Sequence, residues 1–589
     1  MRYLRMLTNS LIGGLLAATY VSILVLQLNP ELSVEPRAVA PLFLTLVGTY
    51  GVHLAVTYYA LIVVRQLVGE EVLSPGWLSL RLLVWLSVGS AGAAATLMWM
   101  NLRGFAVTLE PGAGRRMAAG AAAVSLCALL FLVIALVHYS FGRRGSRVSA
   151  TLFGLTAIAS VALPLVARGP ARAASVHYVP VPYEGRAVID SVALEVPPAP
   201  RVLLIMLDGA SLDVIAPAAA EGHLPNFGRI LDGGAVMHLA SLRPTQPAPV
   251  WTTVATGKWP SKNGVRSAAL YRVAPDAAPL SLLPDLCFAH ALVRFGFLSE
   301  EWYSSGALRA RPLWNILSSL DMAVGIVGWP LTHPTQPVRG YIVSDRFSRF
   351  SEPFEAADEI GIYPAEVMPA VRTAASAPAA PPAAGAMTAM AEPPLQSAID
   401  SALQADLAFE RISTLLIEGR GVQFSAVRYQ SLDAAGHYLL RYARPSAFGD
   451  VSENERRLYG GVLERHYGQI DQIIGRTLAR LSPRDLLLVA SGFGMEPLTP
   501  GKRLLERTVG NARLSGTHEG APDGFLLAYG AGIAAGRLPR ASVVDVAPTI
   551  LYFLGLPVGR DMDGYARTDL FSRAFTADRP IAFIPTYDR

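Results

Sequence analysis

Five long stretches without any Asp, Glu, Lys or Arg constrain the fold of this chain more than any other feature. They cover residues 6–30, 38–64, 82–102, 117–142 and 148–167. Each has about 20 residues or more, which is enough for a helix to cross a hydrocarbon layer of roughly 30 Å. A soluble helix of that length would show a polar face. The stretches therefore predict a five-span membrane domain over residues 1–168.

The first stretch has no small-residue cleavage pattern after it, so it reads as a span and not as a secretory signal peptide. Arginines lie between the spans. An amino terminus inside the cell places Arg2, Arg5 and the cluster Arg143, Arg144, Arg147 on the cytoplasmic side, as the positive-inside rule favours. An odd number of spans then places everything after Arg168 outside the cytoplasm, in the periplasm if the source is bacterial.

The net charge does not indicate nucleic-acid binding. Residues 1–168 hold twelve Arg against five Glu, a net of +7 within a chain total of +5, which leaves −2 for the other 421 residues. The basic excess thus belongs to the loops and ends of the apolar stretches. The two cysteines, Cys127 and Cys287, lie far apart in the sequence, so they predict neither a disulfide framework nor a cysteine zinc site.

The pattern changes after a proline-rich tether, predicted at 169–200. The run 202–207 is fully apolar and ends at Asp208, and similar runs at 424–429 and 486–489 precede Asp433 and Ser491. A buried strand with a carboxylate at its carboxyl end is typical of a parallel sheet whose edge carries an active site. We therefore expect an α/β domain with a mostly parallel central sheet flanked by helices over 201–589, with a low-complexity Ala/Pro insertion near 373–395.

Several motifs of this domain resemble those of one known family. In order, they are Leu207-Asp208-Gly209, Pro225-Asn226-Phe227, the segment 251–257, Asp433-Ala434-Ala435-Gly436-His437, Gly516-Thr517-His518, and the segments 545–549 and 561–564. The chain resembles the type I phosphodiesterase/nucleotide pyrophosphatase branch of the alkaline phosphatase superfamily. The resemblance covers residues 201 to about 570 and implies an alkaline-phosphatase-like fold.

The residues themselves favour a divalent metal ion. Asp433 and His437 are four positions apart, so a helix or tight turn brings the carboxylate and the imidazole to one face. The resemblance implies that Asp433, His437 and His518 hold one zinc-type ion. It also implies that Asp208 belongs to a second metal position.

The chain departs from the family pattern at that second position. The family carries an Asp-His pair where this chain has Ala490 and Ser491, and the nucleophilic Ser or Thr falls at Pro247. We therefore predict one ion per chain. Thr245 is the nearest upstream hydroxyl and the candidate nucleophile; a metal-activated water and a merely turn-capping Thr245 are the alternatives.

Three function classes follow. The first is a membrane-anchored, metal-dependent phosphoester hydrolase, most simply a phosphodiesterase acting outside the cytoplasm. The second is a transferase that moves phosphoethanolamine or phosphoglycerol from lipid to an envelope glycan, which is an analogy of architecture alone. The third is a degraded member that binds a ligand without catalysis. The expected partners are a phosphoester substrate, lipid or glycan included, and the lipid bilayer, with no nucleic acid.

Overall fold

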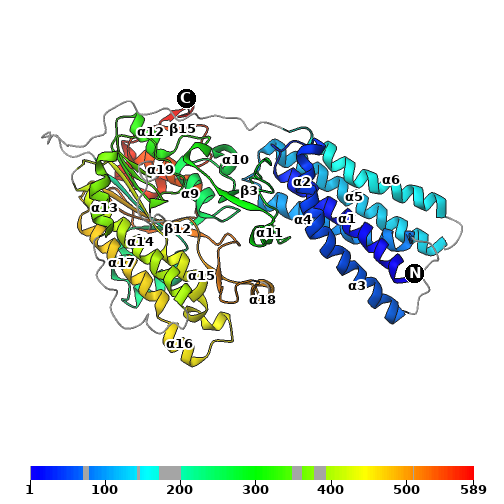
Figure 1. Ribbon diagram of the computed structural model, residues 1–589. Helices are drawn as coiled ribbons and strands as arrows, with labels where there is room; N and C mark the ends of the chain where they lie inside the picture. The colour runs from blue at the N-terminus through cyan, green and yellow to red at the C-terminus, as the bar shows by residue number, and fades with distance from the viewer. Residues whose placement is uncertain are drawn as a thin grey trace. The chain divides into compact units, whose positions relative to one another are not determined.

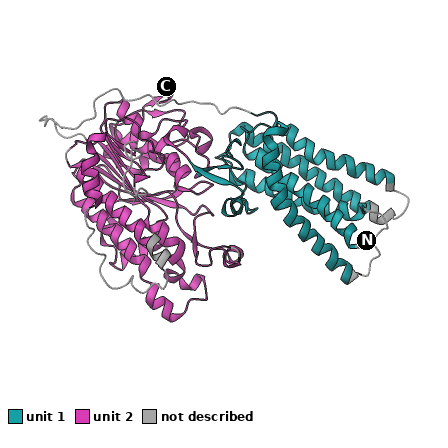
Figure 2. Ribbon diagram, in the orientation of Figure 1, with its two compact units in different colours: residues 1–175, 269–302 teal, residues 176–268, 303–589 magenta. Residues whose placement is uncertain are grey.

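The computed structural model describes residues 2–69, 78–141, 146–171, 200–347, 361–376, 393–418, 420–508 and 510–588 (Figure 1). Most of the predicted tether 169–200 and positions 377–392 of the predicted insertion lie outside these residues. The chain packs as two compact units (Figure 2). Unit 1 contains residues 1–175 and 269–302, and unit 2 contains residues 176–268 and 303–589.

Unit 1 is built on apolar helices. Their bounds are α1 Arg2–Leu28, α2 Pro36–Leu46, the π-helical turn η1 Val47–Gly51, α3 Val52–Gly69, α4 Leu80–Gly104, α5 Pro111–Phe141 and α6 Ser146–Arg168. Among the described residues, five helical stretches are long and apolar enough to cross a membrane: Tyr3–Leu28, Pro36–Leu67, Leu80–Gly104, Pro111–Val137 and Arg147–Arg168. These five stretches match the five uncharged runs of the sequence.

Small residues and one buried arginine hold the helices of unit 1 together. A Cβ atom on Gly14 of α1 would lie 2.4 Å from the carbonyl oxygen of Gly51, so only glycine allows the two backbones to come this close. Arg168, at the end of α6, is 3% exposed. Its guanidinium donates to the carbonyl oxygens of Leu26, in the last turn of α1, and of Asn29 and Leu32, which follow that helix.

Residues 269–302 interrupt the sequence of unit 2 but pack with the helices of unit 1. They form the antiparallel strands β3 (Ala269–Arg272) and β4 (Ser299–Trp302), with the short helix α11 (Ala289–Arg294) between them. The α/β domain predicted over 201–589 includes this stretch.

Unit 2 is an α/β domain, as the sequence predicts. Its strands are β1 Val202–Leu207, β2 Ala235–Ala240, β5 Val324–Val327, β6 Gly340–Val343, β7 Ile362–Tyr363, β8 Phe424–Tyr429, β9 Leu486–Ser491, β10 Glu496–Pro497, β11 Gly516–Thr517, β12 Gly524–Gly530, β13 Gly536–Arg537, β14 Ala541–Ser542, β15 Val558–Gly559 and β16 Phe583–Ile584. Its helices are α7 Leu212–Ala220, α8 Pro225–Gly233, α9 Pro247–Thr256, α10 Pro260–Asn263, α12 Leu313–Ser319, α13 Met368–Ser376, α14 Pro393–Ile417, α15 Ser431–Ala443, α16 Glu453–Tyr459, α17 Val462–Ala479, α18 Pro500–Thr508, α19 Val546–Phe553 and α20 Arg573–Ala577.

The main sheet of unit 2 has ten strands within the described residues. Nine follow the order β13-β2-β12-β9-β1-β8-β5-β6-β7, and β14 also pairs with β2. The pairs from β9 through β6 are all parallel, whereas β12 runs antiparallel to both of its neighbours and β7 is antiparallel to β6. The three strands expected from sequence are therefore adjacent at the centre. Burial on both faces explains the continuous apolar runs 202–207 and 486–489, whereas β8 also contains Ser425 and Arg428.

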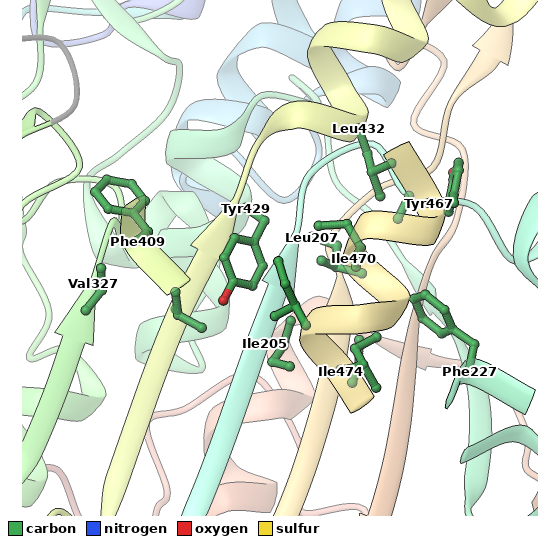
Figure 3. Packing of buried hydrophobic residues seen from close by; sticks show 14 of the residues in the cluster. Ile205, Leu207, Phe227, Val327, Phe409, Tyr429, Leu432, Tyr467, Ile470 and Ile474 are labelled. Atoms are coloured by element: carbon green, nitrogen blue, oxygen red, sulfur yellow. The ribbon is translucent and has the colours of Figure 1, made fainter. Parts of the chain in front are cut away.

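One face of the sheet packs against α8, α14, α15 and α17 to form an extended hydrophobic core (Figure 3). Ile205 and Leu207 of β1 lie between β8 and α17, whose Ile470 and Ile474 point onto the sheet. Helices α9, α12 and α19 lie on the other side (Figure 1). This layering brings the carboxyl ends of β1, β8 and β9 to one edge of the domain.

Candidate metal centre

The register of three neighbouring strands positions the candidate site. Leu207, the last residue of β1, pairs with Tyr429 of β8 on one side and with Ser491 of β9 on the other. The three strands thus end level with one another, and the residues that follow them share one edge of the sheet. Helix α15 begins at Ser431, directly after β8, and carries Asp433 in its first turn and His437 one turn later.

Among the described residues, Asp433, His437 and His518 form a group with ligand atoms within 4.8 Å of one another. Nε2 of His437 lies 3.6 Å from Oδ2 of Asp433, and Nε2 of His518 lies 3.6 Å from Oδ1 of Asp433. The three side chains are between 13% and 27% exposed, so the group lies just below the surface. We refer to these three residues as the triad.

The donor set fits a divalent ion. The Nδ1 atom of His437 lies 2.9 Å from the carbonyl oxygen of Gly516. A proton on Nδ1 donated to that carbonyl leaves Nε2 as the free ligand atom, the second contact that metal-binding histidines usually make. Within the described part of the chain, the buried atoms Oδ1 of Asp433 and Nδ1 of His518 have no hydrogen-bond partner. A buried carboxylate oxygen without a partner is costly unless a cation binds it.

Glycines let the backbone approach the triad. Gly209 follows Asp208 with a φ of 69°, and a Cβ there would lie 2.9 Å from Cα of Asp433. Gly516 lies against α15, where a Cβ would come within 2.4 Å of the carbonyl oxygen of Gly436. Both positions therefore require glycine, which explains the glycines beside Asp208 and His518 in the sequence motifs.

A buried carboxylate holds the start of α15. Asp406 of α14 accepts hydrogen bonds from the backbone nitrogens of Gln430 and Ser431, each at 2.8 Å. It is fully buried, and burial raises the pKa of Asp406 to about 7. Asp406 belongs to none of the sequence motifs, yet it satisfies two of the amide groups that a helix start leaves free.

The carboxylate of Asp208 forms hydrogen bonds with Arg428 and Trp251, which are not members of the triad. Its Oδ2 accepts from Nε and Nη2 of Arg428, at 3.0 and 2.5 Å, and its Oδ1 accepts from the indole nitrogen of Trp251 at 2.6 Å. Asp208 is 1% exposed and Arg428 is 5% exposed. Burial alone would lower the pKa of Arg428, but the Asp208 carboxylate raises it above its ordinary value, so the guanidinium stays charged.

The second metal position implied by the family resemblance does not fit these residues. Ala490 and Ser491, at the end of β9, are fully buried, and the Ser491 hydroxyl donates to the carbonyl oxygen of Phe493 at 2.7 Å. Neither offers a charged ligand, and both oxygens of Asp208 already accept strong hydrogen bonds. Asp208 is predicted from the sequence as a metal ligand. Its contacts in the structure favour an ion pair with Arg428 instead.

A family model described as type I phosphodiesterase/nucleotide pyrophosphatase matches residues 202–546, more than half of the chain. The chain belongs to this family. No curated protein matches it. Solved structures similar to it include murine ectonucleotide pyrophosphatase/phosphodiesterase 5, in an inactive form in complex with AMP, at 13% identity and a TM-score of 0.38. The human form of the same protein has 14% identity and a TM-score of 0.37; both comparisons cover 63% of this chain and all of the other.

Pro247, where the family resemblance predicts the nucleophile position, is the first residue of α9. Thr245, the predicted nucleophile, is 2% exposed, and its hydroxyl donates to the carbonyl oxygen of Leu242 at 2.8 Å. This contact is the one that a turn-stabilising threonine makes.

Trp251 and Trp329 are fully buried and their rings meet edge to face, so both side chains belong to the core of the domain.

Proposed function

We propose that this family member is a membrane-anchored phosphodiester hydrolase that works with one divalent ion, of zinc type, held by the triad. The observation that carries the proposal is the convergence of Asp433, His437 and His518 around a carboxylate oxygen without another partner. Two imidazoles and one carboxylate leave a coordination position open, as catalytic zinc sites do.

The roles of the chain's own residues follow from their contacts. When bound, the ion would polarise a phosphoryl oxygen of the substrate. His437 is held in one orientation by Gly516, and Asp406 fixes the turn that presents Asp433. Thr245 remains the candidate side-chain nucleophile, and to attack it would exchange its hydrogen bond to Leu242 for one to the substrate.

The substrate class comes from the family, whose members are phosphodiesterases and nucleotide pyrophosphatases. We propose action outside the cytoplasm. The five candidate spans and the arginine distribution support this side of the membrane for unit 2. A phosphodiester within a lipid or an envelope glycan is a substrate that membrane anchoring would bring within reach.

The test is hydrolysis of bis(p-nitrophenyl) phosphate by the full-length protein in detergent with added zinc. We expect slow, metal-dependent release of nitrophenol that Asp433→Asn reduces to background. His223→Ala is the matched control, since that exposed histidine pairs with Glu464 instead. Activity that survives in Asp433→Asn would disprove the assignment of the triad.

The same assay separates the sources of the attacking oxygen. If Thr245 is the nucleophile, Thr245→Val is inactive and Thr245→Ser keeps activity. If water attacks, both variants hydrolyse the substrate at similar rates. Adding a glycan acceptor tests the transferase alternative. Transfer would release one nitrophenol and attach the nitrophenyl phosphoryl group to a glycan hydroxyl, whereas hydrolysis would release nitrophenol and free nitrophenyl phosphate.

A second candidate is a family member that binds a phosphoester without cleaving it. Pro247 at the nucleophile position and the pair Ala490 and Ser491 at the end of β9 favour it, because these residues supply neither a hydroxyl nor a metal ligand. Calorimetric binding of a phosphodiester to the zinc-loaded protein, without hydrolysis over days, would support this function.

A further inference from the structure

Residues 280–298 form a cap on one end of the helices of unit 1. The cap fills a space beside α1, α2 and α4 with apolar side chains. Its buried members are Leu280, Leu282, Leu283, Cys287, Ala289, Leu292 and Leu298, and they pack against Val25, Leu26, Leu42 and Leu46 among others. The cap is therefore a fixed part of unit 1 and not a loose loop.

Polar side chains from the apolar helices satisfy the irregular backbone of the cap. Oδ1 of Asn29 accepts from the amides of Ser281 and Leu282, at 2.8 and 2.9 Å, and its Nδ2 donates to the Leu282 carbonyl oxygen at 2.9 Å. Asn101 does the same for Asp285, accepting from its amide at 2.7 Å and donating to its carbonyl oxygen at 3.1 Å.

The hydroxyl of Tyr50 completes this arrangement by donating to the carbonyl oxygen of Cys287 at 2.7 Å. Asn29 and Asn101 are at most 1% exposed, so these contacts are sealed from water. Irregular backbone at membrane depth is tolerated only when protein groups take up its hydrogen bonds. Asn29, Asn101 and Tyr50 supply such hydrogen bonds to the backbone of the cap.

The outer side of the cap is apolar. Leu286, Phe288, Phe295 and Phe297 are 51%, 65%, 56% and 48% exposed. Leu286 and Phe288 have φ angles of 65° and 58°, a region that is unfavourable for large side chains. The cap backbone thus holds large apolar groups outward at a conformational cost, and exposing them to water would add a second cost.

The position of the cap along the helices identifies what covers this face. Val21 lines one small cavity together with Leu280 and Leu292 of the cap, and it lies seven residues before the end of α1, which is about 10 Å at 1.5 Å per residue. Asn101 lies three residues before the end of α4. The cap therefore sits at the level of the last turns of two candidate spans, where a bilayer changes from headgroups to hydrocarbon.

We infer that Leu286, Phe288, Phe295 and Phe297 insert into the lipid interface and anchor the chain there, beyond the anchoring that the spans provide. Amphipathic segments bind membranes in this way through Phe and Leu at the boundary of the acyl chains. Strands β3 and β4 connect the cap along the chain to residues 268 and 303 of unit 2. The inference rests on the proposed membrane anchoring.

Site-directed spin labelling of the full chain tests it. With Cys127→Ala and Cys287→Ala as background, single cysteines replace Phe288 or Phe295 and carry a nitroxide in discs of phosphatidylcholine and phosphatidylglycerol. Leu129 of α5, 60% exposed, is the control for lipid, and Tyr565 of unit 2, 78% exposed, is the control for water. The readout is the ratio of collisions with oxygen to collisions with a soluble nickel chelate.

We expect the ratio at positions 288 and 295 to exceed that at 565 several-fold and to lie below that at 129. A ratio equal to that at 565 would overturn the inference, and so would protection from both reagents, which would mean that protein covers the face. A water-like ratio at 129 as well would instead refute the membrane anchoring itself, so the two failures can be told apart.

Discussion

At the scale of single residues, the main feature of the site is that a guanidinium lies beside the carboxylate expected to serve a second ion. Arg428 binds Asp208 through two nitrogens, and both residues are buried. Unlike a metal ion, a buried guanidinium has no open coordination position for a phosphoryl oxygen. It balances the charge of Asp208 but does not provide the second clamp that two-metal sites use. We therefore expect low or specialised turnover.

Truncation of this ion pair should reveal its importance for stability. We expect Asp208→Ala and Arg428→Ala each to destabilise unit 2 by about 3–5 kcal/mol, because each leaves a buried charge without its partner. The double variant should lose much less than the sum of the two, which thermal unfolding of the three proteins measures. Strictly additive losses would mean that the pair is not coupled.

The triad was predictable from sequence and Arg428 was not. Asp433 and His437 are local neighbours on a helix, and His518 follows a recognisable motif. Arg428 pairs with Asp208 only because β1 and β8 are neighbours, with Met206 in register with Arg428. Its one signal in the sequence is a lone charge inside the run 424–429, which is otherwise without charge.

At the scale of elements, the central strands are the best predicted parts of the fold. The runs 202–207 and 424–429 are the strands β1 and β8, and β9 extends two residues beyond the predicted 486–489. The cap differs, since its partners lie far away in sequence: Asn29 binds residues about 250 positions later. Apolar residues between two short strands indicate a core contact but not which helices provide it.

Helix α17 carries a titratable group that makes the stability of unit 2 depend on pH. His466 is 3% exposed, and burial lowers its pKa from 6.5 to about 4. The folded protein therefore favours neutral His466, and its contribution to stability is complete above pH 6.5 and lost as the pH falls toward 4. At about 1.4 kcal/mol for each pKa unit, the loss amounts to about 3 kcal/mol.

Chemical unfolding at several pH values between 7 and 4 measures this effect. His466→Phe should flatten the curve, whereas His223→Gln, at an exposed position, should leave its slope unchanged. A slope in His466→Phe equal to that of the unmodified protein would assign the pH dependence to other groups.

At the scale of the whole molecule, five apolar helices precede an α/β domain of the phosphodiesterase family. Composition was sufficient to predict this order, because helices in lipid need uninterrupted apolar sequence and parallel strands need apolar runs with polar ends. The side of the membrane on which unit 2 lies does not follow from composition. The arginine distribution predicts the outer side.

Reporter fusions test that orientation. An alkaline phosphatase reporter after residue 175 should be active, because it would lie outside the cytoplasm, and a reporter in the loop 142–147 should be inactive. A cytoplasmic result after residue 175 would require either a different number of spans or an amino terminus outside the cytoplasm, and it would place the triad in a different metal environment.

The measurement closest to the central claim is the metal content of the purified full-length protein. After loading with zinc and removal of free ions, mass spectrometry should find close to one ion per chain, because the triad supplies the three protein ligands of a catalytic zinc site and Asp208 pairs with Arg428. His437→Ala should abolish binding, and His223→Ala should not change it. Two tightly held ions in the unmodified protein would contradict the account, since Asp208 would then have to leave Arg428 and bind a metal.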